Sequence, residues 1–150
     1  MIIRTPTFAD YDRIMELLID MANFNELTEL QNPDYNDKYI RNLLCNCQKS
    51  GVVLVAEHNN KIEGVIIGAI MPNIWLNNVN WLREIAFWVT PTGFKHNAGV
   101  KLINAFKQRA LYLLDNGVID NFVITSLEKL PVDYEKYGFN KLETNYSWSK

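Results

Sequence analysis

Apolar residues recur along the chain with two different periods, and these periods divide the sequence into short helices and strands. The first helical pattern has apolar side chains at i, i+3, i+4 and i+7: Ile14, Leu17, Leu18 and Met21. This spacing places them on one face of a helix. Thr7 caps that helix, and Asp10 three residues later makes a weaker relative of the capping box. Residues 1–4 are predicted to form a short strand before it.

A second helix is predicted from Asp37 to Lys49, with Ile40, Leu43 and Leu44 facing inward and Gly51 ending it. Residues 24–35 between the two helices are expected to be irregular. Two strands follow, at 52–57 and 62–71, joined by a tight turn at Asn59-Asn60. A loop over 72–80 leads to an apolar, aromatic strand over 81–90, which the pattern predicts to be buried.

The second half of the chain begins with a predicted loop over 91–97. A long amphipathic helix follows, ended by Gly117 and marked by Leu102, Ile103, Phe106, Ala110, Leu113 and Leu114. A strand at 121–125, a short helix at 132–137 and strand segments over 139–148 complete the pattern. The order β α α β β β α β α β predicts a mixed α/β fold with an antiparallel centre, since a doubly wound fold would alternate strand and helix throughout.

Composition narrows the class of protein. The chain has 150 residues, 48% of them hydrophobic, which suits a single domain over 1–150 with a sizeable core. The net charge of −2 disfavours a general nucleic-acid binder. The N-terminus has no signal-peptide pattern, and the longest apolar run, 64–71, is strand-sized. We therefore expect a cytoplasmic protein without a membrane partner.

No metal site is expected. Cys45 and Cys47 stand two positions apart, which is a poor spacing for a disulfide, and two thiols are too few for a structural zinc site. His58 and His96 are far apart in sequence and have no carboxylates at ligand spacing. Reduced thiols on a helix, one facing in and one facing out, are the simplest interpretation of the cysteines.

The junction between the 81–90 strand and the long helix could bind an anion. The first-turn N–H groups of a helix lack intrahelical partners, and the helix dipole adds partial positive charge there. Such a terminus suits a pyrophosphate. Ala98 and Gly99 are small residues that let the backbone approach a ligand closely. Many strand–loop–helix junctions bind nothing, so this pattern alone does not decide the function.

These residues carry a family resemblance. Val89-Thr90-Pro91, with a loop that ends in Ala98-Gly99, resembles motif A of the GNAT acetyltransferases, which reads V-x-P, then Arg or Gln, then G-x-G or G-x-A, then a Leu-rich helix. The segment 133–139, DYEKYGF, is similar to the family's second signature, F-Y-E-K-x-G-F. The family's strand order also matches the predicted order over the whole chain. With Glu143 and Tyr146, the sequence looks most like short bacteriophage-encoded GNAT proteins.

The resemblance implies the GNAT fold: a mixed, mostly antiparallel sheet flanked by helices, with a V-shaped cofactor gap between the strands at 81–90 and 121–125. It implies acetyl-CoA as co-substrate and no metal. The implied cofactor-binding residues are Phe87, Trp88, Val89, Phe94, Lys95, His96, Asn97, Ala98, Gly99, Val100 and Tyr137. The chain departs from the family at Phe94, where Arg or Gln is usual, and at Lys95 and Asn97, where the first loop glycines are usual. Asn tolerates positive φ, so Asn97 can keep the turn.

Two residues are candidates for acid–base chemistry. Amine acetylation requires a base, because an alkyl amine is protonated at neutral pH. Glu84 lies on the 81–90 strand, and Glu84-Ile85-Ala86-Phe87 looks like the histone-acetylating branch of the family, whose base is the matching Glu. Tyr134 holds the position of the family's acid, with Tyr137 as the runner-up. The structural alternatives are a Glu paired with a basic side chain and tyrosines packed on the sheet.

The resemblance thus implies an N-acetyltransferase that moves an acetyl group from acetyl-CoA directly to a primary amine in a ternary complex. The amine belongs to a small molecule or a protein, and a homodimer is plausible by family analogy. A phage origin would place the protein in the host cytoplasm. The alternative is a non-catalytic GNAT-like interaction module, such as a phage accessory or virion-associated protein, which the altered loop residues favour.

Overall fold

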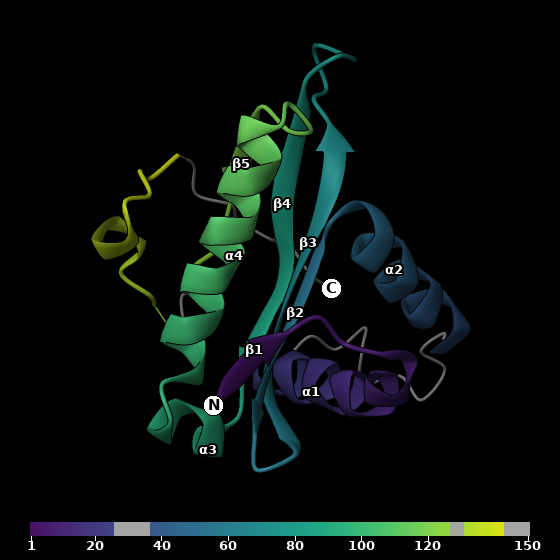
Figure 1. Cartoon of the computed structure of the whole chain (residues 1–150), viewed down its shortest axis with the longest axis vertical. Coiled ribbons are helices and arrows are strands. Elements are labelled where there is room, and N and C mark those ends of the chain that lie inside the picture. The colour runs from purple at the N-terminus through teal and green to yellow at the C-terminus, as the bar shows by residue number, and fades with distance from the viewer. Residues whose placement is uncertain (26–36, 127–130, 143–150) are drawn as a thin grey trace, which may run out of the picture.

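A computed structural model describes residues 1–25, 37–126 and 131–142 of the chain. Helices α1 (Tyr11–Phe24), α2 (Asp37–Ser50), α3 (Pro91–Lys95) and α4 (Ala98–Asp115) accompany strands β1 (Ile2–Arg4), β2 (Val52–His58), β3 (Lys61–Pro72), β4 (Asn80–Val89) and β5 (Asn121–Val123). Short 3-10 turns η1 (Phe8–Asp10) and η3 (Tyr134–Tyr137) complete the described elements. Figure 1 shows α4 lying along one side of the sheet and α1 and α2 on the other.

The strands form a five-stranded sheet in the order β1-β2-β3-β4-β5. Neighbouring strands from β1 to β4 are antiparallel, whereas β5 pairs with β4 in parallel. The pairing of β4 with β5 covers all of β5 but only the start of β4, and it ends where Arg83 faces Val123. Because β4 continues to Val89, its second half has no β5 neighbour, and the sheet opens there into a V-shaped gap.

Each face of the sheet has its own hydrophobic cluster. On the side of α1 and α2, Ile14, Leu17 and Leu44 pack with strand residues such as Val55 and Val65. On the other side α4 contributes the buried residues Ala98, Leu102, Phe106 and Ala110. These clusters explain the two predicted amphipathic patterns, since a helix of this length gains most of its stability by burying its apolar stripe on the sheet.

Two β-bulges change which side chains point inward. Ala56 of β2 pairs with Gly64 while Glu57 pairs with Ile62, so Glu63 is an extra residue in β3. Likewise, Ile67 pairs with Ala86 and Gly68 with Glu84, which makes Ile85 the extra residue in β4. A bulge breaks the strict alternation of a strand and re-aims the side chains on either side of it. A period of two cannot predict such positions.

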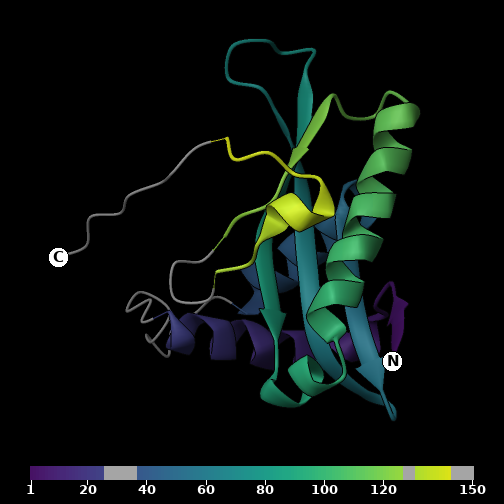
Figure 2. The same ribbon diagram turned by 90° about the vertical axis from the view of Figure 1, so that its left-hand side faces the viewer.

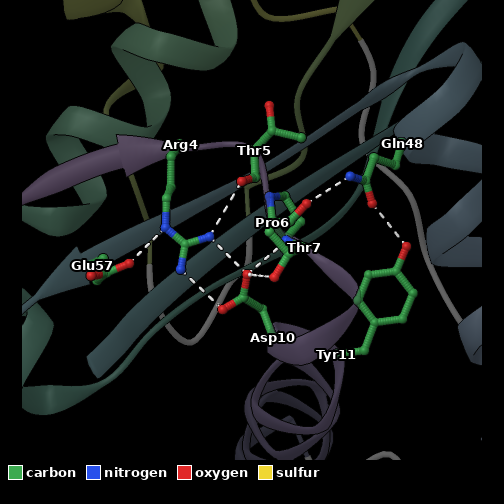
Figure 3. Close-up of polar contacts among 8 residues, drawn as sticks. All are labelled: Arg4, Thr5, Pro6, Thr7, Asp10, Tyr11, Gln48 and Glu57. Carbon is green, nitrogen blue, oxygen red and sulfur yellow. Dashed lines mark hydrogen bonds and ion pairs between the residues drawn. The ribbon is translucent and has the colours of Figure 1, made fainter. Parts of the chain in front are cut away.

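A polar network joins the N-terminal segment to the sheet and to α2 (Figure 3). The Arg4 guanidinium donates from Nε to Glu57 at 2.6 Å and from Nη1 to Asp10 at 2.7 Å. The same Asp10 carboxylate accepts the backbone N–H of Thr7 at 2.7 Å, which completes the predicted capping box. Thr7 caps the 3-10 turn η1 and not α1 itself, whose N-cap residue is Asp10. Arg4 holds the pKa of Asp10 below its usual range, chiefly through their hydrogen bond.

The structure confirms the predicted first, second and long helices and the central strands within a few residues, and it corrects the prediction at four places. The predicted loop over 91–97 contains helix α3, because Thr90 caps its N-terminus and Pro91 is well suited to a first helical position. The predicted strand over 121–125 ends at Val123. The predicted helix over 132–137 is a single 3-10 turn, Tyr134–Tyr137.

The predicted final strand is wrong in its first part, since residues 139–142 form no strand, and the rest of it lies outside the described residues. The predicted irregular segment over 24–35 also lies largely outside them. Cys47 is buried and Cys45 is partly exposed, and both are free thiols, in agreement with the prediction. No helix among the described residues is long and apolar enough to cross a bilayer.

Candidate active site

The gap between the second half of β4 and the chain that follows β5, called the β4–β5 gap below, forms a cavity of about 570 Å³. Figure 2 shows the chain after β5 leaving β4, with η3 and α4 alongside the opening. The cavity is lined from both faces of the sheet. Its lining residues are Met21, Asn25, Glu84, Ile85, Ala86, Phe87, Trp88, Val89, Phe94, Asn97, Gly99, Val100, Ile103, Thr125, Val132, Tyr134 and Tyr137. Most of them are apolar or aromatic, as is usual for a small-molecule site.

Glu84 is a buried carboxyl in the wall of this cavity, with a side chain only 9% exposed. Its Oε2 accepts the backbone N–H of Thr125 at 3.0 Å. Burial disfavours the charged form and raises the pKa of Glu84 to about 7, although the hydrogen bonds from Thr125 act in the opposite direction. A carboxyl with a pKa near neutrality is suited to accept a proton at physiological pH.

Tyr134 lies across the gap from β4, in the 3-10 turn η3. Its hydroxyl donates to the backbone carbonyl oxygen of Thr125 at 3.0 Å. The pKa of Tyr134 is raised above its usual range, first by burial and then by the charges of Glu84 and Tyr137. The hydroxyl therefore keeps its proton at neutral pH, which is the form that a general acid requires.

The N-terminus of α4 forms the other end of the cavity. Asn97 precedes the helix in the left-handed conformation, with φ of 58°, and its side chain makes no capping hydrogen bond. The helical ladder starts where Lys101 donates its N–H to the carbonyl of Asn97 at 3.2 Å. The N–H groups of Ala98, Gly99 and Val100 precede this first helical hydrogen bond, so no carbonyl of the helix accepts them. Such N–H groups at a helix N-terminus suit an anion.

Gly99 leaves room beside these N–H groups. A Cβ at Gly99 would lie 3.7 Å from the Phe87 ring and 3.8 Å from Val89, which is ordinary van der Waals contact. Packing within the protein therefore does not demand glycine at this position. Since Gly99 lines the cavity, the missing side chain leaves open the surface where a ligand would meet the backbone.

No group of three or more potential metal ligands gathers in the described parts of the chain. The loop that precedes α4 is instead held by hydrogen bonds to β3. The Thr90 hydroxyl donates to the buried Glu63 carboxyl and accepts the Gly93 N–H at 3.0 Å. The Thr90 N–H adds a backbone bond to the Glu63 carbonyl at 2.9 Å.

Comparison with known proteins supports the fold. No protein-family model matches the sequence, and a search of curated proteins finds no match. Solved structures do match over essentially the whole chain. A Trypanosoma brucei acetyltransferase is 21% identical, covers 99% of each chain and superposes with a TM-score of 0.70. A GNAT family acetyltransferase of Staphylococcus aureus is 16% identical over 99% of this chain and 98% of that one, with a TM-score of 0.61.

A transcriptional regulator from Bacillus halodurans is similar too, at 16% identity over 99% of each chain with a TM-score of 0.71. The chain has the GNAT fold. At these identities the likeness establishes the architecture alone, because one fold can serve many activities. The fold class predicted from the sequence is thereby confirmed, including the mixed sheet and its gap.

The GNAT fold brings most of the predicted site residues to one cavity. The lining includes Glu84 and Tyr134, and also Phe87, Trp88, Val89, Phe94, Asn97, Gly99, Val100 and Tyr137. The side chains of Lys95, His96 and Ala98 do not line it. His96 instead stacks on His58 with ring centroids 4.1 Å apart, and the Ala98 side chain is buried in the cluster between α4 and the sheet. The N–H groups of His96 and Asn97 are bonded within the loop, so the N–H groups of 98–100 are the candidates for an anion.

Several cavity residues were missed by sequence reasoning. Thr125 contacts both Glu84 and Tyr134 through its backbone, and Met21 and Asn25 reach the cavity from α1. Backbone contacts leave no mark in a residue pattern, so Thr125 gave no signal. Met21 was predicted as a core residue, and only the position of α1 beside the gap shows that it also lines the cavity.

Proposed function

We propose that this protein is an N-acetyltransferase that uses acetyl-CoA to acetylate a primary amine. The observation that carries the proposal is Glu84, a buried carboxyl with a pKa near 7 in the wall of the β4–β5 gap. A base of this kind is the group that amine acetylation needs, since the amine must lose its proton before it attacks. The GNAT fold and the N–H groups at the start of α4 support the same conclusion.

The residues of the gap fit the proposed co-substrate. The N–H groups of Ala98, Gly99 and Val100 would hold its pyrophosphate, at a helix end whose dipole favours negative charge. The backbone from Phe87 to Val89 pairs with β3 on one side and has no β5 partner on the other, so the peptide groups that face away from β3 are available to the pantetheine amides. Phe94 and Tyr137 add apolar surface to the same cavity.

Acetyl-CoA supplies a thioester, whose acyl group passes to the amine when the new C–N bond forms and the C–S bond breaks. Starting from the ammonium form, the nitrogen loses two protons. Glu84 accepts the first before attack, directly or through a water molecule. Tyr134 donates its hydroxyl proton to the departing sulfur, and the second nitrogen proton restores the Tyr134 hydroxyl, so that the amide, the free thiol and protonated Glu84 remain. We propose direct transfer within a ternary complex, so no enzyme side chain carries the acetyl group.

The second candidate function is a GNAT-like module without catalysis. It is favoured by Phe94, Lys95 and Asn97, which replace the usual residues of the phosphate loop, and by the likeness to a chain described as a transcriptional regulator. In this case the cavity would bind a structural ligand or none. Glu84 argues for the enzyme, because its buried carboxyl would otherwise be a cost without a chemical use.

Calorimetric titration with acetyl-CoA tests the proposal first. We expect saturable binding, and a lack of binding at millimolar ligand would exclude the proposed enzyme. A panel of amines follows, comprising lysine peptides, N-terminal peptides, polyamines and aminoglycosides, with release of free coenzyme A thiol as the signal. Binding of acetyl-CoA without transfer to any amine would favour the non-catalytic module.

A further inference from the structure

The buried polar residues of this protein gather at the two ends of the proposed site. Among the described residues, the buried polar or charged ones are Glu84, Glu63 and Thr90. Glu84 lies at the acyl end, whereas Glu63 and Thr90 contact each other behind the phosphate-binding end. The proposed chemistry uses Glu84 but not Glu63. The Glu63 carboxyl is compensated by the Thr90 hydroxyl and by Lys61, whose Nζ lies 3.8 Å from its Oε1. A buried carboxyl that is held in this way fixes the position of the groups bonded to it.

Glu63 reaches its buried position because of the bulge in β3. The strand residues on either side, Ile62 and Val65, both belong to the cluster under α1 and α2, although they are three positions apart. The extra residue in the strand makes this possible. The Glu63 side chain is thereby turned toward Thr90 at the end of β4, and the residue is only 4% exposed.

The contact between Glu63 and Thr90 fixes the start of the loop. The Thr90 hydroxyl donates to Glu63, which leaves its oxygen lone pairs free to accept the Gly93 N–H at 3.0 Å and to cap α3. Gly93 is pressed against the same residue, since a Cβ there would lie 2.6 Å from the Glu63 carbonyl oxygen. Side chain and backbone of Glu63 thus hold the loop at one place.

The remaining loop bonds transmit this position to α4. Phe94 donates its N–H to the Thr90 carbonyl at 3.0 Å, and Asn97 donates its N–H to the Phe94 carbonyl at 3.1 Å. Asn97 in turn begins α4, where Lys101 bonds to its carbonyl. A continuous series of hydrogen bonds therefore runs from Glu63 to Asn97 and Lys101, the residues on either side of 98–100. The proposed function assigns the N–H groups of 98–100 to the pyrophosphate.

We propose that Glu63 is a positioning residue for coenzyme A: by orienting the Thr90 hydroxyl, it sets the geometry of the phosphate-binding loop and hence the affinity for the ligand's phosphates. This inference rests on the proposed function. It differs from a purely structural role, because the loss of the contact should affect ligands that carry the pyrophosphate and spare those that lack it.

The test compares variants that keep or remove the hydrogen bond at nearly constant shape. Thr90→Val is isosteric but has no hydroxyl, and Thr90→Ser keeps the hydroxyl. Glu63→Gln keeps an acceptor oxygen, whereas Glu63→Leu has none. We expect Thr90→Val and Glu63→Leu to weaken coenzyme A binding about tenfold in calorimetry, because small misplacements of a positioning loop are costly. Thr90→Ser and Glu63→Gln should stay within about threefold of the wild type.

A second readout separates positioning from general structure. Acetyl-pantetheine has the thioester but neither pyrophosphate nor adenosine. Thr90→Val should raise KM for acetyl-CoA about tenfold and leave kcat/KM for acetyl-pantetheine within about twofold of the wild type. Thermal melting shows which variants are folded at the assay temperature. If Thr90→Val is unfolded there, Thr90→Ala takes its place.

The outcomes distinguish the two proposals. Wild-type protein that does not bind coenzyme A overturns the proposed function and, with it, this inference. Wild-type binding that Thr90→Val and Glu63→Leu leave unchanged overturns this inference alone. Equal losses of kcat/KM with acetyl-CoA and acetyl-pantetheine also overturn it, because they would mean that Glu63 stabilises the whole site and not the phosphate-binding loop alone.

Discussion

Glu84 and Tyr134 are joined through a single residue. Thr125 donates its backbone N–H to the Glu84 carboxylate and accepts the Tyr134 hydroxyl through its carbonyl oxygen, each at 3.0 Å. The proposed base comes from β4 and the proposed acid from η3, and the chain after β5 holds both. The backbone of Thr125 therefore holds the Glu84 carboxyl and the Tyr134 hydroxyl at a fixed separation.

The first prediction concerns the role of Glu84 in turnover. Glu84→Gln should lower kcat by about 10²–10⁴, the usual contribution of a general base, while acetyl-CoA still binds. In the wild type, kcat/KM should rise as the pH passes about 7, because the deprotonated form of Glu84 is the active one. Steady-state rates between pH 5 and pH 9 measure both effects.

Glu135→Gln is the matched control for this substitution, since Glu135 is an exposed carboxyl in η3 beside Tyr134. It should leave the rate and its pH dependence unchanged. A Glu84→Gln variant that keeps wild-type turnover would remove Glu84 from the mechanism.

The second prediction concerns stability. Burial raises the pKa of Glu84 from 4.5 to about 7, so between these values the folded state binds more protons than the unfolded state. The contribution of Glu84 to stability is therefore present at low pH and lost as the pH rises through about 7. Relative to wild type, Glu84→Gln should gain up to about 3 kcal/mol in free energy of unfolding between pH 4 and pH 8.

Urea unfolding of both proteins at the two pH values provides the measurement. A free-energy difference between variant and wild type that is independent of pH would mean that the Glu84 pKa is the same in the folded and unfolded chains.

The third prediction separates the two tyrosines. Tyr134→Phe should slow turnover by about 10–100-fold, because the leaving sulfur loses its proton donor. It should cost only about 1 kcal/mol of stability, the net value of one hydrogen bond. Tyr137 lines the same cavity, and Tyr137→Phe should leave kcat nearly unchanged. If Tyr137→Phe is the slow variant, the proton donor is Tyr137 and not Tyr134.

The fourth prediction is an opposite effect on stability and binding at Gly99. Alanine fits there without a clash and is favoured over glycine in a helix by about 1 kcal/mol, so Gly99→Ala should raise the melting temperature. The added methyl group would occupy the surface beside the α4 N–H groups, and coenzyme A affinity should fall about tenfold or more.

Asn104→Ala is the control for Gly99→Ala. Asn104 is exposed on α4 and does not line the cavity, so alanine there should stabilise the helix without an effect on binding. Calorimetry and thermal melting of the two variants provide the comparison. Unchanged coenzyme A affinity in Gly99→Ala would argue against phosphate binding at this helix end.

Much of the fold could be predicted because it depends on local periodicity. The helical spacing of Ile14, Leu17 and Met21 and the stop at Gly117 follow from side chains that are neighbours in sequence, and the structure confirms α1 and α4. The short helix α3 was missed because its five residues give too little periodicity, although Pro91 after Thr90 was a usable signal. The early end of β5 was missed because pairing depends on the direction of β4.

The sequence by itself determined the order of the elements, the fold class and the stretch of chain where a cofactor site was expected, because hydrophobic periods and short motifs are written in neighbouring residues. Only the tertiary structure decided what Glu84, Glu63 and Thr125 contact. Two bulges turn Glu63 and Glu84 inward. The cavity opens beside Glu84 because the pairing of β4 with β5 ends at Arg83. Such contacts join residues tens of positions apart, and the pKa of a buried carboxyl depends on all of them.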